Sequence, residues 1–234
     1  MAVRILIVDD DELSREVLML LAAVAGYEVD AVDSGDAALE QVQRTRPDVV
    51  LTDIQMPGTA GDELAQRLRS LCGAGTQLLA MSASELEDGV GREFDGFLLK
   101  PFTMEALTAA ISDRFLRVEN NPTSAGSSVL DEDVYAKLAG SMRGVQLKEL
   151  YALCRRDAEV RVERMRQAAS LGDDATYRKE AHALKGGCGM VGAVELQRLA
   201  TSMEERGLRG DDVATLEEFL LASEQLRRIL VARE

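Results

Sequence analysis

The chain has 234 residues, enough for one large domain or two small ones. Its formal net charge of −14 disfavours nucleic acid as a partner, because phosphate backbones are bound by Lys and Arg. The acidity is concentrated in residues 1–120, which hold 22 acidic and 10 basic side chains. Three scattered cysteines, no signal peptide and no apolar run long enough to span a bilayer predict a cytoplasmic protein without disulfides, a zinc site or a membrane segment.

The first half of the chain alternates predicted strands with predicted helices. This alternation predicts an α/β domain, a five-stranded doubly wound parallel sheet with helices on both faces. The strands are expected at 3–8, 27–32, 49–52, 77–81 and 96–99, and the helices at 12–25, 34–45, 62–71 and 103–117.

The second half has a different character. Residues 119–129 lack apolar periodicity and contain many turn-forming residues, so we expect a linker between a domain at 1–118 and a domain at 130–234. No strand pattern is found after this linker. A short helix and four long amphipathic helices, joined by short loops, predict an all-α antiparallel four-helix bundle. These helices are expected at 131–139, 145–171, 174–188, 192–206 and 212–231.

Polar side chains follow the ends of four predicted strands. Asp9 and Asp10 end the first strand, Asp53 the third, Ser82 the fourth and Lys100 the fifth. Because the carboxyl ends of parallel strands share one edge of the sheet, we expect these side chains to converge. Clustered carboxylates attract Mg²⁺, and with their repulsion screened one of them can attack phosphorus to form an acyl phosphate. A lysine and a hydroxyl can bind the remaining phosphoryl oxygens.

Another chemistry fits part of this pattern. Asp9, Asp10 and Asp11 could mimic the Asp-x-Asp nucleophile of an acid phosphatase. That interpretation leaves Asp53 unexplained, so we favour the first. Acids that gather at strand ends without any role would explain Asp11 alone, but not the whole set.

Residues 3–117 resemble a response-regulator receiver domain, which has a flavodoxin-like fold. The resemblance implies that Asp53 is the phosphoacceptor, that Ser82 is the switch hydroxyl and that Lys100 binds the phosphoryl group. It also places Phe97 where the family has a rotating aromatic, although a Phe in a strand is equally typical of a core. The motifs are Ile5-Leu6-Ile7-Val8-Asp9-Asp10, Leu51-Thr52-Asp53-Ile54-Gln55-Met56-Pro57 with Gly61, Met81-Ser82-Ala83 and Lys100-Pro101-Phe102.

The same resemblance implies a magnesium site. Asp10 and Asp53 would be direct ligands, Asp9 would hold a metal-bound water, and the backbone carbonyl of Gln55 would complete the protein's share. The chain departs from the family between Ser82 and Lys100, where it is a few residues short. We therefore expect a short or distorted helix there.

The single histidine, His182, lies in a predicted helix in the second half. Lys185, three residues on, and Gly186, four residues on, share its face. Imidazole is a good nucleophile near neutral pH, and nearby cations with open space around the ring would suit a phosphohistidine. The alternative is a surface histidine on a helix that ends early at Gly186.

The string Glu180-Ala181-His182-Ala183-Leu184-Lys185-Gly186-Gly187 resembles a histidine-containing phosphotransfer (HPt) domain, which would cover about 130–231. The resemblance implies that His182 is phosphorylated and that Lys185 is its supporting cation. No second histidine and no Gly-rich ATP-binding pattern accompany it, so we expect this half to exchange phosphoryl with an aspartate and not to make phosphohistidine from ATP.

Together the motifs predict a two-component phosphorelay protein in which Asp53 accepts phosphoryl from a phosphohistidine and His182 shuttles it to or from a receiver aspartate. The expected cofactor is Mg²⁺, and the expected partners are a sensor histidine kinase and another receiver or HPt protein. In the alternative function, the bundle binds a kinase or regulator under phosphorylation control without chemistry at His182. A DNA-binding output is disfavoured, since no basic patch or recognition helix is evident. The sequence leaves open the direction of flow and whether the chain is part of a longer hybrid kinase.

Overall fold

The structure is a computed structural model that describes residues 2–82, 91–100, 102, 104–112, 117–118, 129–209 and 212–233. The chain divides into two compact units, Met1–Pro122 and Thr123–Glu234. The exact domain boundaries and the linker at 119–129 stay predictions, because residues 119–128 lie outside the described part of the chain.

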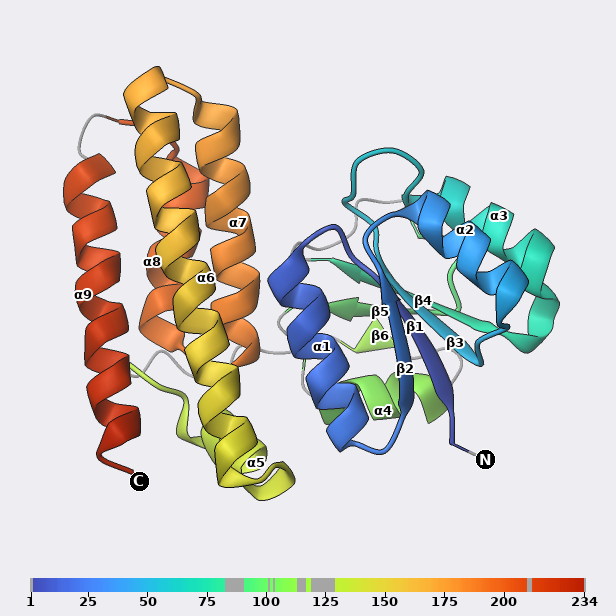
Figure 1. Ribbon diagram of the computed structural model, residues 1–234. Coiled ribbons are helices and arrows are strands. Elements are labelled where there is room, and N and C mark those ends of the chain that lie inside the picture. The colour runs from blue at the N-terminus through green and yellow to red at the C-terminus, as the bar shows by residue number, and fades with distance from the viewer. Residues whose placement is uncertain are drawn as a thin grey trace. The chain divides into compact units, whose positions relative to one another are not determined.

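The first unit is a parallel sheet with the strand order β2-β1-β3-β4-β5-β6 (Figure 1). Every neighbouring pair of strands is parallel. α1 and α4 lie on one face of the sheet, and α2 and α3 on the other (Figure 1). The elements are β1 Arg4–Val8, α1 Glu12–Val24, β2 Glu28–Val32, α2 Gly35–Arg44, β3 Val49–Asp53, α3 Gly61–Cys72, the 3-10 turn η1 Gly73–Gly75, β4 Gln77–Ser82, β5 Gly96–Leu99, α4 Met104–Ser112 and β6 Arg117–Val118.

This arrangement confirms the predicted doubly wound parallel fold. Every residue of β3 and β4 is buried, as expected of central strands covered on both faces. β2 and β3 pair with opposite edges of β1, so the strand order reverses at β1. The carboxyl ends of β1 and β3 therefore flank the crevice in which open α/β sheets bind ligands.

The end of this unit differs from the prediction. The prediction that the last helix reaches Arg117 is wrong, because Arg117 and Val118 form a short sixth strand parallel to β5. β5 would otherwise be an edge strand with unpaired backbone groups. Residues 117–118 pair with Phe97 and Leu98 and satisfy part of that edge. The helix expected to be short or distorted, between Ser82 and Lys100, falls largely on residues 83–90, which lie outside the described residues.

The second unit is built from helices, as predicted. The short helix α5 Glu132–Ser141 is followed by α6 Gly144–Leu171, α7 Asp174–Met190, α8 Val194–Arg206 and α9 Asp212–Val231. Buried Leu, Met, Ala and Val side chains from these helices form the core, together with Tyr177 and Phe219. α6 ends at Gly172, whose φ of +69° is a left-handed conformation that glycine adopts without strain.

The helix that carries His182, α7, is long and firmly joined to α6. It continues through Gly186 and Gly187 to Met190, so it does not end early beside His182. A buried ion network joins it to α6, since Arg161 contacts Asp157 at 2.6 Å and Glu180 at 2.9 Å. Within the described residues, no helix combines the length and the apolarity needed to cross a membrane.

Candidate functional site

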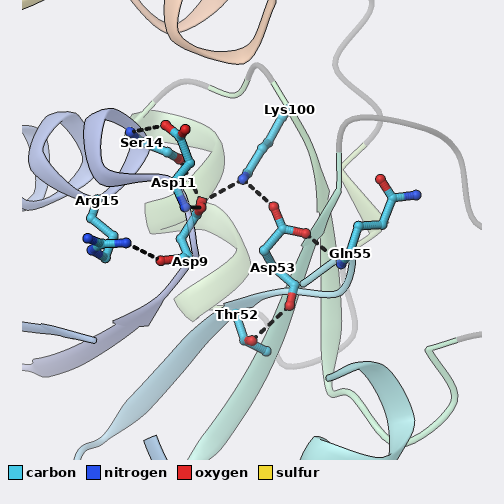
Figure 2. Close-up of polar contacts among 8 residues, drawn as sticks. All are labelled: Asp9, Asp11, Ser14, Arg15, Thr52, Asp53, Gln55 and Lys100. Carbon is cyan, nitrogen blue, oxygen red and sulfur yellow. Dashed lines mark hydrogen bonds and ion pairs between the residues drawn. The ribbon is translucent and has the colours of Figure 1, made fainter. Parts of the chain in front are cut away.

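Two carboxylates and one ammonium group meet at the carboxyl edge of the sheet (Figure 2). Lys100 Nζ lies 2.7 Å from Asp9 Oδ2 and 2.6 Å from Asp53 Oδ2. All three side chains are at least nine-tenths buried. The strands explain the meeting, because Asp9 follows β1, Asp53 ends β3 and Lys100 follows β5.

Local hydrogen bonds fix both carboxylates in place. Asp9 Oδ1 accepts from the backbone N–H of Asp11 at 2.9 Å, and its Oδ2 also accepts from the Ser14 hydroxyl at 2.6 Å. Asp53 Oδ1 accepts from the backbone N–H of Gln55 at 2.7 Å (Figure 2). Each carboxylate therefore has a set orientation with one oxygen toward Lys100.

Burial and ion pairing act in opposite directions on Lys100. Burial is the largest single influence and lowers its pKa, but the combined attraction and hydrogen bonding of Asp9 and Asp53 outweigh it and raise the pKa overall. Lys100 is consequently a fixed positive charge between two buried carboxylates.

The other predicted residues of this edge are not part of the contact between Lys100, Asp9 and Asp53. Ser82 is completely buried at the end of β4, and its carbonyl accepts from the backbone N–H of Lys100 at 2.6 Å. Gln55 is exposed, whereas Asp10 and Phe97 are half-buried. Among the described residues, no three metal-binding side chains of the Asp, Glu, His or Cys type lie close enough together to hold an ion. Lys100 instead bridges Asp9 and Asp53.

The donor chemistry and the charge of this edge nevertheless fit Mg²⁺. The edge offers carboxylate and carbonyl oxygens, which hard cations prefer. Asp9, Asp10 and Asp53 bring three carboxylates to strand ends at this edge and Lys100 brings one ammonium group, which leaves an excess of negative charge that a divalent cation would balance.

The second site surrounds His182 on α7. Its Nδ1 lies 2.6 Å from Glu204 Oε1 on α8, and Lys185 Nζ donates to Glu204 Oε2 at 3.1 Å. The His182 side chain is 35% exposed, so a partner can reach the ring from solvent. One carboxylate thus orients the imidazole and the ammonium group together.

Glu204 was not predicted from the sequence. It lies 22 residues from His182 on another helix, and no spacing rule connects the two. The only available signal was that α7 and α8 are joined by a short loop and must pack together.

The contact with Glu204 selects one tautomer of the neutral ring. Glu204 is partly buried, which raises its pKa, but hydrogen bonding and attraction from His182 and Lys185 outweigh burial, so its pKa is lowered overall. An ionised carboxylate only accepts hydrogen bonds, so His182 Nδ1 must carry the hydrogen. In the neutral ring, Nε2 then keeps its lone pair.

A second contact holds the end of α8 that carries Glu204. Arg178 on α7 donates to the backbone carbonyls of Glu204 and Glu205 and pairs with Asp174 at 2.7 Å. These carbonyls belong to the last turn of α8 and have no partner within the helix, so a cation is favourable there. Gly207 ends the helix with a φ of +60°.

The surface next to the histidine is open. A Cβ atom added at Gly186 would meet no atom within 4 Å beyond its chain neighbours and the backbone of its own helix. Lys179, on the preceding turn, is exposed.

This fold and these two sites define a receiver-like unit followed by a histidine phosphotransfer module. Comparison with known families agrees: residues 5–112 match the response regulator receiver domain, and residues 149–230 match the Hpt domain. The chain therefore carries a receiver domain followed by an Hpt domain. Such domains are components of two-component phosphorelays, in which receivers commonly use Mg²⁺.

Individual relatives match about half of this chain, and the chain spans about half the length of the curated relatives. The response regulator MprA of Mycobacterium leprae is 39% identical over 130 residues, which are 54% of this chain and 56% of that protein. The chemotaxis protein CheY4 of Vibrio cholerae has a TM-score of 0.45 and 28% identity, covering 50% of this chain and all of that one. The response regulator TrrA of Thermotoga maritima, solved with Mg²⁺ and BeF, has a TM-score of 0.45 and 29% identity over 48% of this chain and 98% of that one.

Proposed function

We propose that this protein relays a phosphoryl group in a two-component system. Asp53 accepts the group from the phosphohistidine of a sensor kinase, and His182 exchanges phosphoryl with a receiver aspartate, of this chain or of another. The observation that carries the proposal is the contact of His182 with Glu204, which leaves Nε2 as the free nucleophile on a solvent-accessible ring.

At the receiver edge, an Asp53 oxygen attacks phosphorus. The N–P bond of the donor phosphohistidine breaks as the O–P bond forms, and the electron pair stays on the donor nitrogen. Lys100 already lies 2.6 Å from Asp53 and can move with the negative charge to the transferred phosphoryl oxygens. The Ser82 hydroxyl would bind another of these oxygens.

We infer that Mg²⁺ is held here by Asp10, Asp53 and the Gln55 carbonyl, with Asp9 holding a metal-bound water. The bound ion would supply charge neutralisation for the incoming phosphoryl group.

At the helical site, Nε2 of His182 attacks the phosphorus of an aspartyl phosphate. The O–P bond of the acyl phosphate breaks, and the aspartate leaves as a carboxylate. The phosphorylated ring keeps its Nδ1 hydrogen and would gain positive character, which Glu204 stabilises at 2.6 Å. Lys185, held on the other oxygen of Glu204, is placed to attract the phosphoryl oxygens.

The interaction-module alternative makes His182 incidental. The shared contact of His182 and Lys185 with one carboxylate argues for a chemical role instead, because an incidental surface histidine needs no such partner. We further propose a cytoplasmic setting, with a sensor histidine kinase and another receiver or HPt protein as partners.

Phosphotransfer profiling tests the relay. The full chain, its Asp53→Ala variant and its His182→Gln variant are each incubated with a radiolabelled phosphohistidine donor and with a radiolabelled receiver. We expect acid-labile label on His182 and hydroxylamine-sensitive label on Asp53, each lost in its own variant. Label that reaches neither residue, or that is unchanged in both variants, contradicts the proposal.

A further inference from the structure

A groove in the helical unit lies away from the residues of the His182 site. It encloses about 470 Å³, within the range of about 300–1,000 Å³ typical of small-molecule sites. Its walls come from α6 and α9, and residues Cys188, Val191 and Leu196 from the α7–α8 region also line it. None of His182, Lys185 and Glu204 lines it.

The sequence explains why the groove is open. On α6, Gly144, Lys148, Ala152 and Arg155 lie at spacings of three and four and line the groove. Glycine and alanine fill little space there. Lys and Arg side chains can lay their methylene stems along an apolar wall while their charged ends stay in water. A bundle helix with Leu at these positions would close the gap.

The lining combines an apolar interior with charges of one sign. Leu147, Leu226 and Leu230 are among its apolar residues. Its charged residues are Lys148, Arg155, Arg227 and Arg233, and no Asp or Glu belongs to the lining.

The arginines of the rim have carboxylate partners that an incoming anion could replace. Arg227 pairs with Glu224 at 2.7 Å, and both side chains are more than 40% exposed. Arg228 also pairs with Glu224, so that carboxylate keeps a cation if Arg227 turns to a ligand. Arg227 holds Glu224 with two contacts of 2.7 Å, so binding of a ligand carboxylate would replace one exposed bidentate pair by another of the same kind.

One end of the groove carries an aromatic contact as well. Arg233 lies 4.5 Å from the centre of the Tyr135 ring and pairs with Glu132 at 2.5 Å. The cation at this end is therefore held over an apolar surface that belongs to the lining.

We propose that this groove binds an amphipathic anion, a molecule with an aliphatic body and one carboxylate head group. The apolar walls bury the body, and the cationic rim receives the head. The site adds a ligand-binding function to the Hpt unit and does not depend on the phosphorelay proposal.

The two cysteines of the lining do not make the groove a reactive site. Burial raises the pKa of the Cys188 thiol to about 12, and it also raises the pKa of Cys154. Both thiols stay protonated at neutral pH and are poor nucleophiles. The groove is therefore suited to reversible binding.

The test is calorimetric titration of the full chain with decanoate below its micelle concentration, beside decanol and decyltrimethylammonium as neutral and cationic probes of equal chain length. We expect decanoate to bind once per chain, at least about fivefold more tightly than either other probe, which corresponds to one exposed charge contact. Arg227→Gln should weaken decanoate binding about fivefold. Ala152→Phe should weaken it by filling the groove.

Arg198→Gln is the matched control. Arg198 pairs with Glu195 at 2.7 Å with the same three-residue spacing as Arg227 and Glu224, but it does not line the groove. Its loss should leave binding unchanged. No binding of decanoate, equal binding of all three probes, or equal effects of Arg227→Gln and Arg198→Gln would overturn the proposal. If Ala152→Phe lowers helicity, the surface variants still decide. Unchanged binding in His182→Gln separates this result from the fate of the relay.

Discussion

Glu204 selects the tautomer of the neutral His182 ring. Its ionised carboxylate accepts from Nδ1 at 2.6 Å and so leaves the lone pair on Nε2. Replacing it with alanine removes a charge-assisted hydrogen bond and frees the ring to adopt the other tautomer. Glu204→Ala should slow phosphoryl transfer to His182 by about 10–100-fold. Rapid-quench measurement of label transfer from a phosphorylated receiver checks the rate.

Two variants make that prediction sharp. Glu204→Gln keeps an oxygen acceptor without the charge, so its rate should fall between the wild-type and Glu204→Ala rates. Glu205→Ala removes the neighbouring exposed carboxylate and should leave the rate unchanged. A Glu204→Ala rate equal to that of Glu205→Ala would show that Glu204 does not orient the ring.

Lys100 compensates two buried negative charges at once. Lys100→Met would leave Asp9 and Asp53 facing each other without their shared cation, and breaking a buried pair in this way costs about 3–5 kcal/mol of folding free energy. We expect urea titration to show that the unfolding free energy of the receiver unit falls by an amount in this range. Arg44→Met, which removes only an exposed pair with Glu40, should shift it by less than about 1 kcal/mol. Adding Asp9→Asn to Lys100→Met should recover part of the loss, and failure to do so would contradict this explanation.

At the scale of helices, α8 places the Glu204 carboxylate against His182 on α7. Arg178 on α7 donates to backbone carbonyls at the end of α8. Arg178→Ala would remove the cation from the terminal carbonyls of Glu204 and Glu205. We expect a loss of about 1 kcal/mol in bundle stability and faster amide hydrogen exchange in the last turn of α8. Transfer to His182 should also slow, although Arg178 does not contact the ring. Arg166→Ala, which breaks an exposed pair within α6, should change neither exchange nor rate.

The α7–α8 contact should also give the bundle a definite pH dependence. Because the pKa of Glu204 is lower in the folded state than its ordinary value of 4.5, the stability it contributes is present above pH 4.5 and is lost as the pH falls through the folded pKa. The difference in unfolding free energy between the wild type and Glu204→Gln should therefore shrink as the pH falls below 4.5. Urea titrations at pH 6 and at pH 3.5 measure this difference. A constant or growing difference would refute the assignment.

The sequence predicted the elements well but not every contact between them. Apolar periodicity and caps such as Ser34 locate helices, because those signals are local. The convergence of Asp9, Asp53 and Lys100 followed from the parallel sheet, whose topology places strand ends side by side. Glu204 could not be found in this way, since the rotation of one helix against another depends on packing of many side chains. The strand at Arg117 was missed because a two-residue edge strand carries almost no periodicity.

At the scale of the whole molecule, each unit has its own core. Ile5, Leu51 and Leu79 are completely buried in the sheet unit, and Leu216 and Phe219 are completely buried in the helical unit. A domain with its own core can unfold as its own cooperative transition. The chain as a whole is therefore best regarded as two folding units that share one polypeptide.

This independence predicts how the effects of substitutions divide between the units. In the full chain, Lys100→Met should shift only the unfolding transition of residues 1–122, and Arg178→Ala only that of residues 123–234. The double variant should show the sum of the two shifts to within about 0.5 kcal/mol, because substitutions in separate cooperative units act on separate transitions. Urea unfolding followed by residue-resolved NMR distinguishes the transitions, and separately expressed 1–122 and 123–234 should reproduce them. A single unfolding transition that shifts with either substitution would instead show that the two units unfold together as one cooperative unit.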